Sequence, residues 1–265
     1  KIDLRDGDGG NWKRQAWVGL TGKSWGTFTL GRQKDVPNKT FDIQTTRALG
    51  KLSRAFGAAD ARYDGLLKYM TPKFGGVSGG IAYAHGNNDD DFRNFWSLGA
   101  QYENGPLMVG SSYKMNRLRT GYTVRNWGLG GTYDFKVIKL SAGYGQDKNG
   151  KFNAPGDVKR STLDGYSPAG LGDYDTQGFK SKNYYLGAVI PAGANEFGLA
   201  WSRTSSNLGR LIGVADGTQN IFVAQYKYAL SKRTFLYAYG AYAKNLAYLK
   251  GFKGQELAVG MQHRF

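Results

Sequence analysis

Apolar and polar side chains alternate with a period of two through most of this chain. In residues 95–103, Trp96 and Leu98 share one parity, whereas Ser97 and Gln101 share the other. This period places successive side chains on opposite faces of a β-strand. The same alternation predicts further strands at 107–116, 126–135, 138–146, 183–190, 195–203, 219–230, 233–244 and 255–265.

The connections between these segments alternate between short and long. The short connections lie at 21–26, 72–76, 104–106, 191–195 and 230–234. The long connections lie at 34–60, 86–94, 116–122, 147–182, 205–218 and 245–254. Antiparallel neighbours need only a short turn, so this order predicts an up-and-down meander with its long loops at one end.

The two faces of the predicted strands indicate which solvent each one meets. One face carries Leu, Val, Ile and aromatic side chains, and the other carries Gly, Ser, Asn, Gln, Lys and Arg. About thirteen strands closed into a barrel enclose a lumen too wide for the apolar side chains to fill. If the apolar face meets lipid and the polar face lines water, both faces are satisfied, and closure pairs every backbone group. We therefore predict an all-β fold, a transmembrane antiparallel β-barrel, with residues 1–265 as one domain.

Composition and charge narrow the possible functions. Lys and Arg number 36 against 20 Asp and Glu, so the formal net charge is +16, which attracts anionic partners. The basic residues are spread over nearly the whole length, which does not favour a nucleic-acid site. The chain contains no cysteine, which argues against a disulfide scaffold or a thiolate metal site. No apolar run approaches the roughly 18 residues of a membrane-spanning helix.

Candidate chemistry is sparse. The chain has two histidines, His85 and His263, and neither belongs to a recognisable pattern with a nucleophile or a carboxylate. The run NNDDD at 87–91 could bind Ca²⁺ through its carboxylates, although a solvated acidic loop is the simpler interpretation. We therefore expect no enzymatic activity, no cofactor and no metal site.

Residues 34–60 form the longest gap in the alternation within the N-terminal half. The gap carries more basic than acidic side chains, among them Arg47, Lys51 and Arg54. One interpretation is a solvated surface loop, since connections generally run over the surface. The other is a loop folded into a hollow barrel, because long irregular insertions are often functional.

Several short motifs connect this pattern to a known family. The last segment, QELAVGMQHRF at 255–265, is amphipathic and ends in Phe265, like the assembly signal of Gram-negative outer-membrane barrels. Together with RQAWVGL at 14–20, GTFTLGRQ at 26–33 and ARYDGLLKYM at 61–70, the chain resembles the trimeric general diffusion porins of Gram-negative outer membranes, particularly their β-proteobacterial branch. The resemblance covers nearly the whole chain. It implies a 16-stranded barrel, of which about 13 strands are present in this sequence, and the family's first three strands are expected to be absent from it.

The resemblance also implies where a constriction lies. In that family the third extracellular loop folds into the barrel and narrows it, and 34–60 occupies that position. Arg14 and Arg62 match two arginines of the family's basic ladder on the barrel wall, and Arg32 matches a neighbouring basic position. Alternation counted along the strand places Arg62 on the same face as Lys68, whereas for Arg14 and Arg32 it is inconclusive.

The inserted loop departs from the family pattern. The family has a Pro-Glu-Phe-Gly element whose acid faces the ladder, but here residues 53–57 read SRAFG, with Arg54 near the acid's place. Asp42 and Asp60 remain as candidate opposing acids. The constriction is therefore expected to be more positive than is usual in the family.

These observations predict an outer-membrane porin with a water-filled, anion-selective pore for passive diffusion of small hydrophilic solutes and anions. Two alternatives stay open: a channel specific for a particular organic anion, and a structural or adhesive barrel that does not conduct. Polar faces rich in Gly and Ser favour a pore, since a filled lumen needs bulky or paired charged residues. The expected partners are two further copies in a homotrimer, outer-membrane lipids and lipopolysaccharide, and small anionic solutes, but not nucleic acid.

Overall fold

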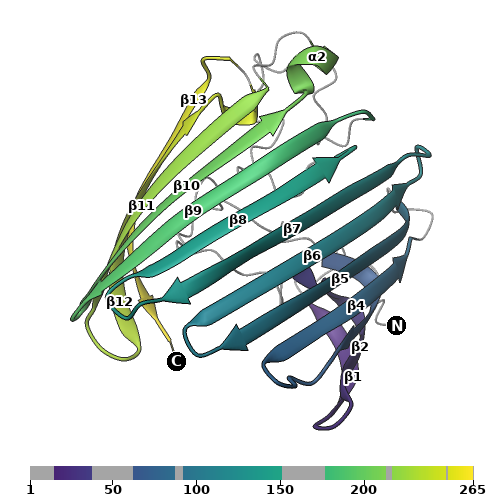
Figure 1. The fold of residues 1–265 in the computed structure, drawn as a ribbon, viewed down its shortest axis with the longest axis horizontal. Helices are drawn as coiled ribbons and strands as arrows, with labels where there is room; N and C mark the ends of the chain where they lie inside the picture. The colour runs from purple at the N-terminus through teal and green to yellow at the C-terminus, as the bar shows by residue number, and fades with distance from the viewer. Residues whose placement is uncertain are drawn as a thin grey trace. The chain divides into compact units, whose positions relative to one another are not determined.

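The computed structural model describes residues 15–37, 62–86, 92–150, 177–212, 217–248 and 250–264. Within these residues, thirteen antiparallel strands follow one another in sequence order in one sheet (Figure 1). The all-β meander and the number of strands expected from the alternation are thereby confirmed. The chain divides into two compact units, one formed by 1–42 with 58–129 and the other by 43–57 with 130–265.

The strands of the first unit lie where the alternation predicts them, although β5 and β7 each begin three residues before the predicted segments at 95 and 126. They are β1 (Ala16–Gly22), β2 (Gly26–Lys34), β3 (Arg62–Met70), β4 (Val77–His85), β5 (Phe92–Asn104), β6 (Leu107–Leu118) and β7 (Thr123–Asp134), which continues past Leu129 into the second unit. The pairing of β1 with β2 is regular from Ala16 opposite Arg32 to Gly22 opposite Gly26.

The second unit carries the remaining strands and, among its described residues, two short helices. Its elements are β8 (Lys139–Lys148), β9 (Lys180–Ala192), β10 (Asn195–Ser206), α2 (Leu208–Ile212), β11 (Thr218–Ala229), β12 (Thr234–Lys244), η2 (Leu246–Tyr248) and β13 (Lys253–His263). In the part of the chain that the structure describes, no helix is both long and apolar enough to cross a membrane.

Two tight hairpins show how the short turns arise from sequence. Gly105 joins β5 to β6 with a φ of 54°, and Gly193 joins β9 to β10 with a φ of 64°. Each glycine is the first residue of a two-residue loop, as in a type II′ turn, whose twist matches that of the flanking strands. These turns fix the register of their hairpins, with Asn104 opposite Leu107 and Ala192 opposite Asn195.

As predicted, the face with large apolar side chains is exposed, and the opposite face carries small polar side chains. The large apolar side chains expected to point outward are exposed by 40–57%, and they are Trp96, Leu98, Leu129, Leu140 and Leu199. We call the face that carries them the apolar face. The opposite side, the polar face, carries buried small polar residues, among them Ser97, Ser112, Ser141, Asn183 and Ser202. A water-soluble fold would bury the apolar face instead.

β1 and β13 stand at the two ends of the strand order. The expectation of three further strands between them rests on the family pattern, and it stays a prediction.

Candidate functional site

The long connection between β2 and β3 starts on the polar face of the first unit. Its first two residues, Asp35 and Val36, are completely buried. The carboxylate of Asp35 forms an ion pair with the ammonium of Lys114 in β6, whose side chain is only 3% exposed. A buried charge without a counter-charge is strongly destabilising, so this pair holds the start of the connection against the sheet.

Two hydrogen bonds attach the same segment to other strands. Nζ of Lys68 in β3 donates to the backbone oxygen of Lys34 at 2.8 Å. The backbone N–H of Val36 donates to Oγ of Ser97 in β5 over a longer distance of 3.5 Å. With Asp35 bound to β6, the contacts of this short segment span the strands from β3 to β6. The connection therefore begins by crossing the polar face.

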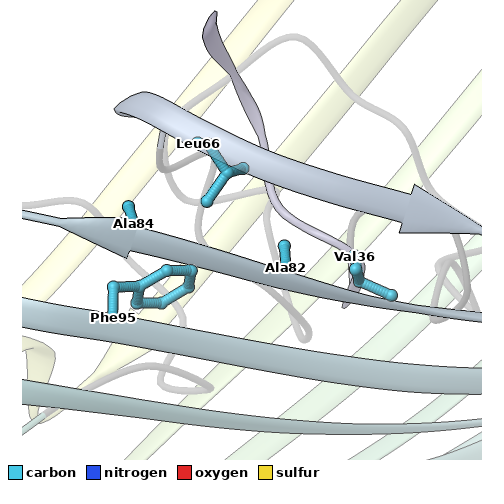
Figure 2. Packing of buried hydrophobic residues seen from close by; sticks show 5 residues of the cluster. All are labelled: Val36, Leu66, Ala82, Ala84 and Phe95. Atoms are coloured by element: carbon cyan, nitrogen blue, oxygen red, sulfur yellow. The ribbon is translucent and has the colours of Figure 1, made fainter. Parts of the chain in front are cut away.

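A small apolar cluster lies under this crossing (Figure 2). Val36 belongs to a buried group with Leu66 of β3, Ala82 and Ala84 of β4, and Phe95 of β5. These apolar side chains lie on an otherwise polar face because the start of the long connection covers them and shields them from water. Burial of such groups contributes about 25 cal/mol per Å² of apolar surface, so the cluster favours the inward course of the connection.

A second set of buried bonds stiffens the wall beside the cluster. Oγ1 of Thr29 donates to Oε1 of Gln33 at 2.8 Å, and Nε2 of Gln33 donates to the backbone oxygen of Leu66 at 2.9 Å. Gln33 is 2% exposed, and both ends of its amide are used. Satisfied buried amides rigidify a wall, whereas unsatisfied ones are costly.

The strand that carries Arg62 is irregular. The pairing of β3 with β2 shifts its register between Tyr63 and Leu66, and Gly65, between them, has a φ of 57°. Glycine adopts this conformation without steric cost, and such a bulge interrupts the alternation of faces. Tyr63 stacks on Phe95 of the polar face with ring centroids 3.6 Å apart. Alternation counted from the C-terminal half of β3 therefore does not extend to Arg62, and the parity on which its placement rested has to be corrected.

The structure places three of the predicted basic residues near the start of the long connection. Arg32 forms an ion pair with Asp64, with Nη1 and Oδ2 2.6 Å apart. Arg62 lies opposite Lys34 across the β2–β3 pair, and its Nε is buried. Lys68 is 8% exposed, and its ammonium holds the backbone of Lys34. Whether these residues act on passing ions stays a prediction.

The other predicted site residues lie outside the described residues. They are Arg14, Asp42, Arg54 and Asp60, together with the acidic run at 87–91.

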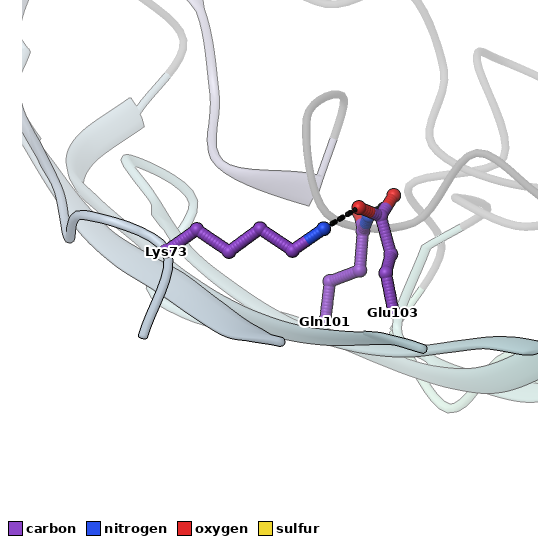
Figure 3. Close-up of polar contacts among 3 residues, drawn as sticks. All are labelled: Lys73, Gln101 and Glu103. Carbon is purple, nitrogen blue, oxygen red and sulfur yellow. Dashed lines mark hydrogen bonds and ion pairs between the residues drawn. The ribbon is translucent and has the colours of Figure 1, made fainter. Parts of the chain in front are cut away.

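Further charges on the polar face lie toward the short turns (Figure 3). Lys73, in the turn after β3, pairs with Glu103 near the end of β5, with Nζ and Oε2 2.6 Å apart. Gln101, two residues earlier on the same face, donates to the other oxygen of Glu103. Both members of the ion pair are about half exposed, so the pair is screened and contributes at most about 1 kcal/mol to stability.

The polar face of the second unit has its own buried network. Oδ2 of Asp147 in β8 accepts hydrogen bonds from Oγ of Ser181 and Nδ2 of Asn183, each at 2.7 Å. Oγ1 of Thr204 donates to Oδ1 of Asn183 at 2.8 Å. Nearer the short turns, Lys227 pairs with Glu196 at 2.7 Å. Small polar residues and partnered charges therefore line this face as well.

Sequence reasoning identified the polar strand faces but not the Asp35–Lys114 pair. The only available signal was that Lys114 shares the parity of Ser112 in β6. Nothing in the sequence around Asp35 indicated its partner, because the pair joins a loop to a strand far along the chain. Fixed charges on such a wall act on ions through their electric field.

Comparisons with known proteins agree with this architecture. A model of the Gram-negative porin family matches residues 1–247. An outer membrane porin protein of Bordetella pertussis is 35% identical over 294 aligned residues, covering 97% of this chain and 73% of the relative.

Solved structures show the same fold. The anion-selective porin from Comamonas acidovorans matches with a TM-score of 0.68 at 24% identity, covering 96% of this chain and 79% of that one. OmpT of Vibrio cholerae, in its trimer form, matches with a TM-score of 0.65 at 15% identity, covering 95% and 80%. Three findings lead to one conclusion: the apolar face of the meander is exposed, the family model matches most of the chain, and the structural neighbours are porin β-barrels. The chain belongs to the Gram-negative porin family, the channel-forming β-barrels of the bacterial outer membrane.

Proposed function

We propose that this porin forms an anion-selective pore for passive diffusion, with residues 34–60 as the constriction loop. The proposal rests above all on the course of the loop's first residues. Asp35 and Val36 are buried against the polar face, which in a porin faces the water-filled lumen. A loop that starts across the lumen wall narrows the channel and brings its own charges close to passing ions.

The charge of the chain supports a preference for anions. The formal net charge is +16, and the loop carries Lys39, Arg47, Lys51 and Arg54. A narrow lumen with low-dielectric walls focuses the field of such residues and raises the local concentration of anions. Rings of Arg and Lys are one of the ways in which pores select anions. The likeness to a porin from Comamonas acidovorans that is anion-selective points in the same direction.

The wall residues have different parts in this proposal. Arg14, Arg32 and Arg62 supply positive charge beside the start of the loop, with Arg32 sharing its charge with Asp64. Arg54 faces them from the loop, while Asp42 and Asp60 are the opposing acids. Lys68 acts mainly by holding Lys34 in place, since its ammonium already binds that residue's backbone oxygen.

The assembly proposed is a homotrimer in contact with outer-membrane lipids. β1 and β2 expose large side chains on the apolar face, among them Leu20 at 71% and Leu30 at 49%. A subunit contact or lipid would cover these side chains. Lipopolysaccharide and small anionic solutes complete the set of partners.

The decisive measurement is the reversal potential across a planar bilayer in a salt gradient. With Arg62 intact, the reversal potential at low salt should have the sign of anion selectivity. Arg62→Glu reverses one fixed charge of the constriction, so it should shift the reversal potential toward cations, and adding Arg54→Glu should shift it further.

Lys23→Glu is the matched control, because Lys23 is exposed in the turn between β1 and β2, at the opposite end of the strands. It makes the same change of total charge and should leave the reversal potential nearly unchanged. If Arg62→Glu has no more effect than Lys23→Glu, Arg62 does not face the constriction and this assignment fails.

A further inference from the structure

β12 places aromatic side chains on the polar face, unlike its two neighbours. Phe235, Tyr237 and Tyr239 occupy every second position near the start of the strand, and Leu236, between the first two, is 42% exposed on the apolar face. Over their described lengths, β11 and β13 have no aromatic residue on the polar face. We call Phe235, Tyr237 and Tyr239 the aromatic row.

The rings of the aromatic row follow the direction of the strand. The ring centroids of Phe235 and Tyr237 are 6.4 Å apart, and those of Tyr237 and Tyr239 are 6.5 Å apart. This spacing is close to the advance of two strand residues, about 6.7 Å. Phe235 and Tyr237 are half-buried, whereas Tyr239 is only 5% exposed. The accessible part of the row therefore lies toward the short turn between β11 and β12.

The neighbouring strand fixes the positions of both tyrosines. Gly260 of β13 lies opposite Tyr237, and a Cβ atom at Gly260 would come within 2.5 Å of the Tyr237 hydroxyl. Tyr237 thus leans across onto β13 in the space that the glycine leaves. The hydroxyl of Tyr239 donates to Oε1 of Glu256 in β13 at 2.9 Å. The ring planes of the two tyrosines differ by only 13°, so they form a preorganised surface.

Hydrogen-bonding groups flank the outer end of the row. Lys227 of β11 lies opposite Tyr237, and its Nζ is 6.0 Å from the ring centroid of Phe235. The same Nζ pairs with Oε1 of Glu196 at 2.7 Å. Gln262 of β13 lies opposite Phe235 and is exposed. Because Glu196 balances the charge of Lys227, this end of the row offers donors and acceptors with little net charge.

This combination indicates the chemistry of a ligand. An aromatic ring carries negative charge density on its faces, which attracts the C–H groups of an apolar surface. A sugar ring presents C–H groups on its faces and hydroxyl groups around its edge. The hydroxyl groups can bond with the carboxylate, ammonium and amide groups beside the rings, whereas an anion would meet a lysine that is already paired. A neutral sugar fits these features better than an anion does.

We propose that the aromatic row is a binding site for neutral saccharides on the lumen wall. The row begins beside a short turn, and short turns of bacterial outer-membrane barrels are periplasmic, so saccharides meet it near the periplasmic mouth. The assignment rests on the proposed function, because a saccharide reaches the row only through a water-filled pore. It does not depend on anion selectivity.

Block of the ion current by maltotriose tests the proposal, with the full-length protein in a planar bilayer. Tyr237→Ala should raise the maltotriose concentration for half-block about three- to tenfold, as expected for the loss of one aromatic contact. Tyr237→Leu, which fills much of the space without an aromatic ring, should weaken the block as well. Tyr237→Phe keeps the ring and should be blocked nearly as well as the unmodified protein.

Tyr228→Ala is the matched control. Tyr228 is 39% exposed on the apolar face of β11, opposite Leu236, so its removal deletes a tyrosine of the same sheet on the side away from the lumen. Its half-block concentration should equal that of the unmodified protein. If Tyr237→Ala and Tyr237→Leu also retain the unmodified half-block concentration, the proposal is overturned.

Two further probes identify what the row recognises. Polyethylene glycol of similar size obstructs the pore by its volume, so it should block the unmodified protein and Tyr237→Leu equally. A change for this polymer as large as that for maltotriose would show that lumen width alone is altered, which overturns the binding site. Block by benzoate that depends on Tyr237, without such block by maltotriose, would make the row a site for aromatic anions and overturn the saccharide assignment.

The two proposals can fail separately. Tyr237→Ala alters no charge, so the reversal potential should keep its sign. Cation selectivity of the unmodified protein, with a maltotriose block that depends on Tyr237, would remove the anion preference and leave the row intact. If the folded protein carries no current, the proposed pore fails, and calorimetric titration of the protein in detergent with maltotriose decides the row alone. Tighter binding by the unmodified protein than by Tyr237→Ala supports the row, and equal binding overturns it.

Discussion

At the scale of single residues, the Asp35–Lys114 pair has the largest consequence. Neither side chain reaches water to a useful extent, with exposures of 0% and 3%. The pair joins the first loop residue to a strand that lies four positions along in the sheet order, from β2 to β6. A buried pair of this kind contributes little net stability but makes the loss of one partner costly. It thereby specifies where the loop begins its course.

Lys114→Met should destabilise the folded protein by about 3–5 kcal/mol, because it leaves the carboxylate of Asp35 without its buried cation. Unfolding by denaturant in detergent measures this loss. The loop start should also loosen, so single-channel conductance should rise or become noisier.

Two comparison variants make that prediction specific. Adding Asp35→Asn to Lys114→Met should recover much of the stability, since the uncompensated charge is then gone. Lys232→Met removes an exposed turn lysine and should stay within about 0.5 kcal/mol of the unmodified protein. A Lys114→Met protein as stable as Lys232→Met would show that the pair does not anchor the loop.

At the scale of elements, each strand separates two environments, with lipid on its apolar face and water on its polar face. β5 illustrates this, because Leu98 is 49% exposed on the apolar face while Ser97, its neighbour, is 1% exposed on the polar face. Gln101 lies on the polar face of the same strand and contacts Glu103. Consecutive residues of the strand therefore face opposite sides of the sheet, one toward lipid and the next toward the lumen. A register slip by one residue would reverse every side chain of the strand.

Leu98→Arg and Gln101→Arg should differ sharply although both add one arginine to β5. The first places a charge against the hydrocarbon, which costs about 2–4 kcal/mol near the bilayer midplane. The second places it on the polar face beside Glu103, where it should be tolerated. Folding yield and unfolding free energy in lipid vesicles measure the difference. Equal destabilisation by the two changes would contradict the assignment of the faces.

At the scale of the whole molecule, the formal charge of +16 acts on every solute that approaches. In the proposal made above, the charges near the start of the loop and on the loop itself set the ion preference.

The anion preference should weaken strongly as salt rises. The Debye length falls from about 30 Å at 0.01 M to about 3 Å at 1 M, so fixed charges on the wall stop influencing ions in the lumen centre. Reversal potentials in gradients of equal ratio, centred at low and at high salt, measure this change. A preference that stays constant across this range would indicate size or specific binding instead of a focused field.

The sequence by itself determined the class of fold, the order of strands and the solvent of each face. Alternation such as that around Trp96 and Ser97 is a local property with a period of two, and glycines such as Gly193 mark the tight turns. Local patterns of this kind survive in the fold because each strand needs only its neighbour in the chain for a partner.

Only the tertiary structure decided the site. The bulge at Gly65 interrupts the alternation from which the face of Arg62 had been counted. A glycine inside a strand often marks a bulge, but the chain has 40 glycines and the sequence does not indicate which of them does so. The partner of Asp35 is far away in sequence, so no period or motif points to Lys114. Neighbours across strands likewise depend on register, because residues such as Lys244 and Lys253 come to lie opposite each other only when β12 and β13 pair. Contacts between distant residues depend on how the strands pair and where the loop crosses them, and these are properties of the folded chain alone.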